Sequence, residues 1–378
     1  MTEERNEFGL LATTRYVPRL RLERGDVLAQ HRWMAPGLKT LAKGRRAMAN
    51  WDEDSVTMAI EAARQLRAAS PDAAVAELTL ASTTLPFAER LNAGIVASAL
   101  GVAPDAVLRD TASSPRAALT ELSAALRRPA NTAAQMLLAS ERRIARPAST
   151  QEMIFGDGAA GALVGNGSPI ATLVASASTH ADLVDHFRQA GEDHEYGWEE
   201  RWVRDEGYMK IAVATLRQCL KDGGVSAGDI GQFAMPAPLA RINDAVAKKL
   251  GIAPAALVSA EHDSVGDLGC AQPLAMLDIA LRAAVPGALV LVAAFGSGCD
   301  ALLLRRTAVP CPGPVPDEGH PETSYMKYLS FTRQIDLAWG MRAEMDNKTA
   351  LTAAWRDHAR ASRFEAGRRS AGGTVQVP

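Results

Sequence analysis

The stretches "GDGAAGALV" (156–164) and "GSGCDALLL" (296–304) each place a turn of small residues directly before a run of apolar residues. In each case the turn is reached through the same order of elements: a helix, an apolar strand, the turn itself and a second apolar strand. An ordinary α/β domain can produce similar turns by chance. Because both the element order and the turn composition recur, the pattern favours two similar halves packed together.

Short apolar segments alternate with amphipathic segments along the rest of the chain. Helices are predicted over 52–69, 90–101, 115–128, 208–225, 242–251 and 270–287, and strands over 74–83, 132–141, 156–167 and 288–306, the last range holding two strands around a turn. Asp54 or Ser55 caps the first helix, Pro115 fits the first turn of the third, and Gly101 ends the second. This alternation predicts helices packed on buried sheets.

Composition narrows the class of protein. The 378 residues carry a formal net charge of −2, which gives no argument for a nucleic-acid or anionic-membrane partner. The longest apolar runs, such as 287–296, are far shorter than the roughly 20 residues of a membrane span, and the polar N-terminus does not resemble a secretory signal. Four separated cysteines without a CxxC pair indicate neither a disulfide framework nor a zinc site, so we expect a cytoplasmic location.

The chain divides into three predicted parts. Residues 1–167 form an N-terminal half, residues 168–335 form a C-terminal half, and residues 336–378 form a tail. A Pro-rich connector over 308–322 and a short aromatic and basic segment over 324–337 mark the change in texture before the tail. We therefore expect the tail to be an appendage of the core.

Four segments together resemble the thiolase superfamily, and most closely its hydroxymethylglutaryl-CoA synthase-like group, which is related to β-ketoacyl-ACP synthase III. They are "ANWDEDSVTMAIEAAR" (49–64), "GDGAAGALVG" (156–165), "AVAKKLG" (245–251) and "FGSGCDALLL" (295–304), and the resemblance covers about residues 8–335. It implies a five-layer αβαβα fold made from two βαβαβαββ halves, usually in a dimer. It also implies acyl-CoA or acyl-carrier thioester substrates, with no separate cofactor, and carbon–carbon bond chemistry through an acyl group on a cysteine.

The resemblance also indicates where the family's catalytic residues should stand, and this chain departs from each. Alignment of Asp110 and the following helix start puts Pro115 at the cysteine position, with Ser114 one residue before it. Counting back from the end of the 242–251 helix puts Pro236 at the histidine position. Asp267 stands at the position of the family's asparagine, where a carboxylate is a poor donor to an oxyanion.

The group's glutamate position falls in "ASTTLP" (81–86), where this chain has Thr83 or Thr84. Candidate acyl acceptors are therefore Ser114, Thr83 and Cys299, with the amides of Gly296 and Gly298 as an oxyanion hole. The ordinary alternatives are a helix cap for the serine and a small buried residue for the cysteine.

Some polar residues outside the family positions are also candidate functional residues. Cys270 opens a predicted helix, and His262 with Asp263 could form an acid–base pair or lie on an ordinary surface. The segment 185–208 is rich in histidine, acidic and aromatic residues, which is typical of a cap over a pocket and equally of a solvated loop. The spacing of its two histidines does not fit a metal pair on a helix, and we expect no metal site.

The tail carries a second resemblance. Residues 355–378 are similar to the opening of the zinc-ribbon/OB-fold proteins that pair with or are fused to these synthases. Arg369 and Gly372 stand where that family has its first two cysteines, and neither can bind zinc. A degenerate, truncated zinc-ribbon segment is the resulting interpretation.

Two main functions follow from these observations. One is a hydroxymethylglutaryl-CoA synthase-like acyltransferase that works by a non-standard mechanism. The other is a catalytically inactive subunit that pairs with an active thiolase-fold paralogue or with an OB-fold partner. A third hypothesis is a scaffold that docks a partner through its tail. We expect a homodimer or a heterodimer in either main case.

Overall fold

A computed structural model describes residues 7–112, 114–130, 132–239, 241–316, 318–338, 351–363, 365–368, 370, 373, 375 and 376.

The strand order reveals the duplication. The strands of the first half are β1 (Glu7–Tyr16), β4 (Val75–Ala81), β5 (Val107–Thr111), β6 (Ala134–Glu141) and β7 (Gly158–Gly167), and those of the second are β8 (Ala171–His180), β11 (Ile230–Ala234), β12 (Leu289–Phe295) and β13 (Gly298–Arg306). They follow the order β11-β12-β13-β8-β1-β7-β6-β4-β5.

Within each half the strands take the same places. The first half runs β5-β4-β6-β7-β1 from its edge inward, and the second runs β11-β12-β13-β8. A strand equivalent to β5 is reduced in the second half to one bridge, between Phe233 and Leu257. The strands of the two halves are joined at a single pairing, between Leu10 of β1 and Ala171 of β8. Equivalent strand orders explain why the sequence pattern repeats.

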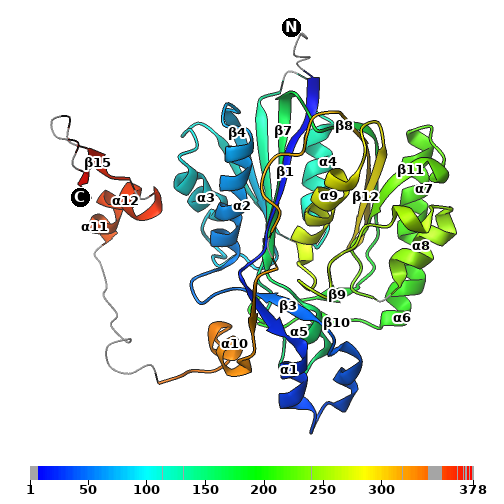
Figure 1. Ribbon diagram of the computed structural model, residues 1–378, viewed down its shortest axis with the longest axis horizontal. Coiled ribbons are helices and arrows are strands. Elements are labelled where there is room, and N and C mark those ends of the chain that lie inside the picture. The colour runs from blue at the N-terminus through cyan, green and yellow to red at the C-terminus, as the bar shows by residue number, and fades with distance from the viewer. Residues whose placement is uncertain are drawn as a thin grey trace.

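Helices form three layers around these strands (Figure 1). The outer helices are α2 (Ser55–Ala69) and α3 (Asn92–Leu100) beside the first half, and α7 (Val213–Asp222) and α8 (Ile242–Leu250) beside the second, while α4 (Ala117–Leu126) and α9 (Gln272–Ala283) lie between the sheets. The central pair belongs to a fully buried core that includes Leu119, Leu122 and Leu274. The predicted five-layer αβαβα fold is confirmed.

Local signals account for the helix boundaries. The Asp54 carboxylate caps α2 by accepting hydrogen bonds from the backbone N–H groups of Val56 at 2.9 Å and Thr57 at 2.8 Å. Gly101 ends α3 in the left-handed conformation, with φ of 63°. The predicted start of the third helix is wrong by two residues, because α4 begins at Ala117 and Pro115 precedes it.

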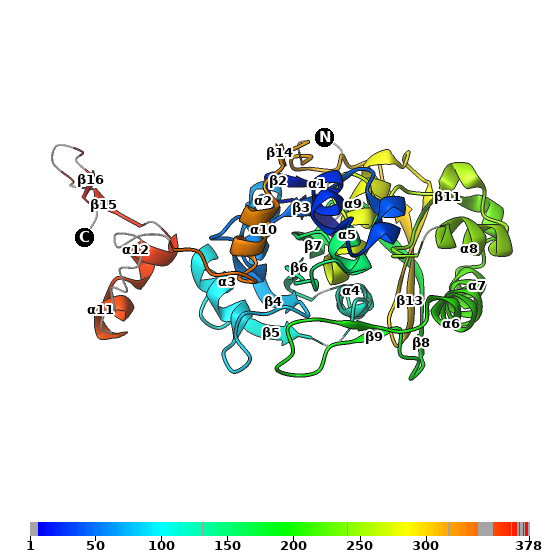
Figure 2. The same cartoon turned by 90° about the horizontal axis from the view of Figure 1, so that it is seen from below.

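A small sheet brings together an N-terminal segment of the chain and the segment that follows the second half's strands. It pairs β2 (Leu20–Glu23) with β3 (Arg45–Met48) and with β14 (His320–Glu322). The segment after β14 forms α10 (Tyr325–Phe331), which packs near α1 (Arg24–His31) through a 2.8 Å contact between the Tyr325 hydroxyl and the His31 ring. The predicted connector thus returns the chain to the N-terminal region, as Figure 2 shows.

The tail contains short elements. These are α11 (Leu351–Arg356), α12 (His358–Arg363), β15 (Gly367–Arg368) and β16 (Val375–Gln376), and the last two pair antiparallel. Arg363 donates to the carbonyl of Ser98 on α3 at 2.6 Å, so α12 contacts the core. The predicted replacements Arg369 and Gly372 lie outside the described residues. Among the helices that the structure describes, none is long and apolar enough to cross a membrane.

Candidate active site

Three residues predicted by separate arguments line one cavity. Pro115, Pro236 and Asp267 all face a space of about 460 Å³ at the junction of the two halves. They come from the segment before α4, from the loop after β11 and from the loop before η5 (Gly269–Ala271). A cavity of this size is typical of small-molecule sites. The fold therefore brings together the positions at which the resemblance locates the family's cysteine, histidine and asparagine.

The second Gly-rich turn holds the segment of the first half that precedes α4. The Ser114 hydroxyl donates to the Gly296 carbonyl at 3.0 Å, and the Arg116 Nε donates to the same oxygen at 2.8 Å. A second guanidinium nitrogen of Arg116 pairs with Asp300 at 2.9 Å. A Cβ on Gly296 would lie 2.5 Å from the serine oxygen, so the close approach requires glycine there.

The first Gly-rich turn holds the opposite segment in the same manner. The Gly156 N–H donates to the Asp267 carbonyl at 2.9 Å, and the Asp267 N–H donates to Ile154 at 2.8 Å. A Cβ on Gly156 would lie 2.2 Å from the Val265 carbonyl oxygen. Each glycine turn thus contacts the cavity-lining segment of the other half, so the repeated motifs have the same structural role in the two halves.

Asp267 is a buried, paired carboxylate. It accepts hydrogen bonds from the Arg143 guanidinium at 2.8 Å and from the Gly269 N–H at 3.1 Å. Burial opposes its charge, but Arg143, His262 and the Gly269 N–H together outweigh burial and hold the pKa of the carboxyl below its ordinary value. Arg143 also lies over the Phe155 ring, with its Cζ 3.8 Å from the ring centroid, and 3.7 Å from Glu195. Asp267 is therefore ionised, and the cavity wall carries an ion pair.

The other predicted acyl acceptors lie elsewhere. The Thr83 N–H and hydroxyl donate to the fully buried Glu141 at 2.9 Å and 3.0 Å. Cys299 is fully buried, and burial raises the pKa of its thiol far above the ordinary value. Neither residue, nor Ser114, is among the residues that line the cavity. Their proposed roles stay predictions, and these contacts favour structural roles.

The remaining candidates have other surroundings. The Gly296 N–H donates to the Gly298 carbonyl at 2.9 Å, so that amide is engaged within its own turn. Cys270 is buried, and its thiol donates to a backbone carbonyl at 3.2 Å. The Asp263 side chain is 80% exposed and 3.9 Å from Arg24, and burial lowers the pKa of His262. Asp263 therefore faces solvent, whereas the His262 ring is largely buried.

Sequence reasoning left several cavity residues without a role. Asp185, His186, Glu195 and Tyr208 come from the segment between β8 and α7, and Arg143 follows β6. The dense histidine, acidic and aromatic content of 185–208 was the available signal, and it pointed to a cap over a pocket as one of two possibilities. The segment does line the cavity.

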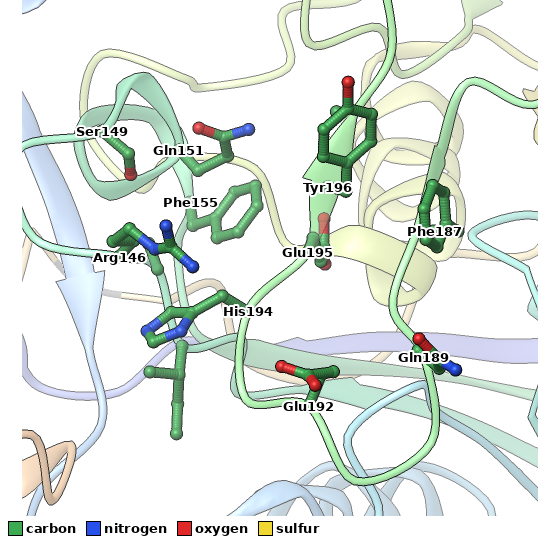
Figure 3. A pocket seen from close by; sticks show the side chains of 13 residues that line it. Arg146, Ser149, Gln151, Phe155, Phe187, Gln189, Glu192, His194, Glu195 and Tyr196 are labelled. Carbon is green, nitrogen blue, oxygen red and sulfur yellow. The ribbon is translucent and has the colours of Figure 1, made fainter.

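A second hollow of about 420 Å³ adjoins the cavity (Figure 3). It shares Gln151, Phe155, Glu195 and Gly197 with the cavity wall. Arg146, which follows β6, and His194, from the segment 185–208, both line it. The described residues contain no group of three or more histidine, cysteine or acidic side chains that could hold a metal ion.

The architecture is the thiolase-like fold. The chain matches a solved 3-oxoacyl-[acyl-carrier-protein] synthase III from Aquifex aeolicus with a TM-score of 0.69 and 19% identity, over 79% of this chain and 99% of that one. It matches MvaS in complex with 3-hydroxy-3-methylglutaryl coenzyme A with a TM-score of 0.67 and 17% identity, over 80% of this chain and 84% of that one.

Sequence comparisons point the same way. Residues 220–305 match the family model of the 3-oxoacyl-[acyl-carrier-protein] synthase III C-terminal region. The chain is 26% identical over 347 residues to the hydroxymethylglutaryl-CoA synthase of Aeropyrum pernix. The aligned region covers 89% of this chain and 93% of that relative. Both sequence comparisons thus find similarity to proteins of the β-ketoacyl-ACP synthase III and hydroxymethylglutaryl-CoA synthase type.

Proposed function

We propose that this protein is an acyltransferase-type enzyme of the thiolase-like superfamily that binds acyl-CoA or acyl-carrier thioesters and makes or breaks carbon–carbon bonds without a covalent acyl-enzyme. The observation that carries the proposal is the convergence of Pro115, Pro236 and Asp267 on one cavity. A cavity is present at these positions, whereas proline supplies neither a nucleophile nor a proton donor. The relatives named as hydroxymethylglutaryl-CoA synthases support the substrate class.

The cavity lining favours a non-covalent route. None of the described residues that line it is a cysteine or a serine. Thr150 is there, but its hydroxyl donates to the neighbouring Gln151 side chain at 3.1 Å. An alcohol also needs an adjacent base to attack a thioester, and no such base contacts this threonine within the described part of the chain. A reaction through an enolate or an alkoxide of the substrate avoids this requirement.

The charges of the lining indicate which end of a CoA ester enters. The acidic residues Asp185, Glu195, Glu200 and Asp267 outnumber the single arginine, Arg143, in the described lining. An excess of negative charge repels phosphate groups, so the phosphates would stay outside the cavity. The uncharged acyl-pantetheine end is the part that suits the space.

A binding assay combined with intact-protein mass spectrometry tests this function. We expect acetyl-, butyryl- or hexanoyl-CoA to bind by titration calorimetry and to leave no added acyl mass. Leu239 lines the cavity, so Leu239→Trp should abolish binding, whereas Leu337→Trp, at an exposed leucine outside the cavity, should not. An acyl adduct on Ser114, Thr83 or Cys299 would contradict the non-covalent route.

The second candidate function is a catalytically inactive subunit. Proline at both the cysteine and the histidine positions favours it, because neither replacement retains a polar group. The edge strand β5 also supports a dimer, since it pairs only with β4 among the described strands and Val107 is 47% exposed. Absence of CoA-ester binding, together with co-purification of a thiolase-fold paralogue, would favour this function over the first.

A proposal for the tail follows the same resemblance. The described tail elements are the helices α11 and α12 and the antiparallel strands β15 and β16, and we propose that they contact an OB-fold or zinc-ribbon partner. Deleting residues 340–378 should abolish that association in a pull-down and leave CoA-ester binding unchanged. Loss of CoA-ester binding on deletion would contradict this separation of roles.

A further inference from the structure

The segment between β8 and α7, within the second half, brings a histidine–aspartate pair to the cavity. Its strands β9 (His186–Phe187) and β10 (Tyr196–Gly197) form an antiparallel pair in which His186 faces Gly197. The Trp198 N–H donates to the Asp185 carbonyl at 2.9 Å and so extends the hairpin by one residue. The hairpin thus fixes the backbone of both residues at the cavity wall.

The pair has the geometry of an oriented base. The Nδ1 atom of His186 lies 3.1 Å from a carboxylate oxygen of Asp185, and the two side chains are 26% and 15% exposed. This contact places the proton of a neutral ring on Nδ1 and leaves the lone pair on Nε2. Nε2 has no hydrogen-bond partner among the residues that the structure describes. The ring lines the cavity, so a substrate there can meet a free basic nitrogen.

Charged groups around the ring favour a basic histidine. Burial opposes the charged form, but Asp185 and Glu195 outweigh burial and the repulsion from Arg143, and the pKa of His186 is raised. A raised pKa makes the neutral ring a stronger base, which suits proton abstraction. Asp185 therefore acts as a positioning residue as well as a source of charge.

Tyr208 supplies a hydrogen-bond donor to the same cavity. It lies on the π-helix η2 (Val203–Ala212), is 3% exposed and packs on Phe295 with ring centroids 4.7 Å apart. Within the described ranges, no protein group bonds to its hydroxyl. Burial and the charges of Asp185 and Asp267 raise the pKa of the phenol well above its ordinary value. The hydroxyl thus stays protonated and remains available to a ligand.

We propose that His186, oriented by Asp185, removes a proton from the α-carbon of a bound acyl thioester, while the Tyr208 hydroxyl donates a hydrogen bond to the resulting enolate oxygen. The inference rests on the proposed function and names the groups that carry it out. The C–H bond breaks, its proton moves to Nε2, and its electron pair forms the C=C bond of the enolate as the carbonyl π electrons move to oxygen. Returning the proton restores the thioester, and no acyl-enzyme is formed.

Deuterium exchange tests this step without knowledge of the second substrate. Wild-type protein in D₂O should exchange the α-hydrogens of bound acetyl-, butyryl- or hexanoyl-CoA faster than buffer does, as measured by NMR. His186→Gln should slow this exchange by about 10²–10⁴-fold. Tyr208→Phe should slow it by about 10²-fold or more. His180→Gln, at an exposed histidine of β8, is the matched control and should exchange at the wild-type rate.

The pH profile separates a catalytic role from a structural one. Exchange should rise with pH through the pKa of His186, because the neutral ring is the base. Asp185→Asn should move the midpoint to lower pH, since it removes the anion that raises the pKa while Glu195 and Arg143 remain. A purely structural role for the pair would lower the rate without moving the midpoint.

The outcomes distinguish the two proposals. Binding without exchange in the wild type, or unchanged exchange in a folded His186→Gln variant, would overturn the inference and leave the proposed function standing. Absence of any CoA-ester binding would overturn the proposed function and the inference together. Circular dichroism of each variant establishes that it is folded.

Discussion

The ion pair between Arg143 and Asp267 gives the sharpest prediction about stability. Asp267→Ala removes a carboxylate that accepts from Arg143 at 2.8 Å, in a site where the two side chains are only 7% and 12% exposed. Leaving a buried charge without its partner typically costs about 3–5 kcal/mol. Glu195 remains 3.7 Å from the guanidinium, so we expect about 3 kcal/mol, the lower end of that range. Asp267→Asn keeps an acceptor and should cost less, about 1–3 kcal/mol.

Urea denaturation at pH 7, followed by far-ultraviolet circular dichroism, measures these costs. The double variant Arg143→Met with Asp267→Ala should be less destabilised than the sum of the two single variants, because it removes both charges of the Arg143–Asp267 pair together. Additive single-variant effects, or a loss below about 1 kcal/mol in Asp267→Ala, would refute the reasoning.

The same pair predicts a pH dependence. The pKa of Asp267 is lower in the folded protein than in an unfolded chain, where it is about 3.9. Its contribution to stability is therefore fully present above the unfolded pKa and is lost as the pH falls through the folded pKa. The difference in unfolding free energy between wild type and Asp267→Asn should shrink across that acidic range. A difference that is constant with pH would contradict the ionised state of the aspartate.

Three further predictions concern the segments that build the site. Pro115→Cys should introduce a thiol at the cavity wall and produce an acyl adduct with acetyl-CoA by mass spectrometry; an unmodified thiol would show that the position does not meet the thioester. Gly296→Ala should destabilise the protein by about 1–3 kcal/mol, because its Cβ would lie 2.5 Å from the Ser114 hydroxyl oxygen. A Cβ on Gly25 would meet nothing within 4 Å, so the control Gly25→Ala should be neutral or stabilising in thermal melts. Asp54→Ala should lower stability by about 1 kcal/mol through loss of the α2 cap, and an equal loss in the exposed Asp52→Ala would argue against capping as the cause.

Local patterns in the sequence were sufficient to predict an α/β fold with two similar halves, whereas the five-layer arrangement was predicted from the family resemblance. The order of helices and strands, the glycines that end helices and the repeated small-residue turns all act over short distances along the chain. The duplication could be predicted because two segments that build equivalent layers must satisfy the same packing requirements. The predicted start of helix α4, at Pro115, was two residues early. The helix begins at Ala117, after the segment whose Ser114 donates to the Gly296 carbonyl, and local patterns do not record that distant contact.

The site could be predicted only in part. The sequence by itself determined the residue types at Pro115, Pro236 and Asp267, and its resemblance to a known family predicted that these three stand at the family's catalytic positions. Only the tertiary structure decided that Arg143 neutralises Asp267 and that Asp185, His186 and Tyr208 reach the same cavity. These residues are far apart along the chain, and no local pattern records which side chains a junction between two halves will bring together. Burial, which sets their charges and pKa values, is likewise a property of the packed molecule alone.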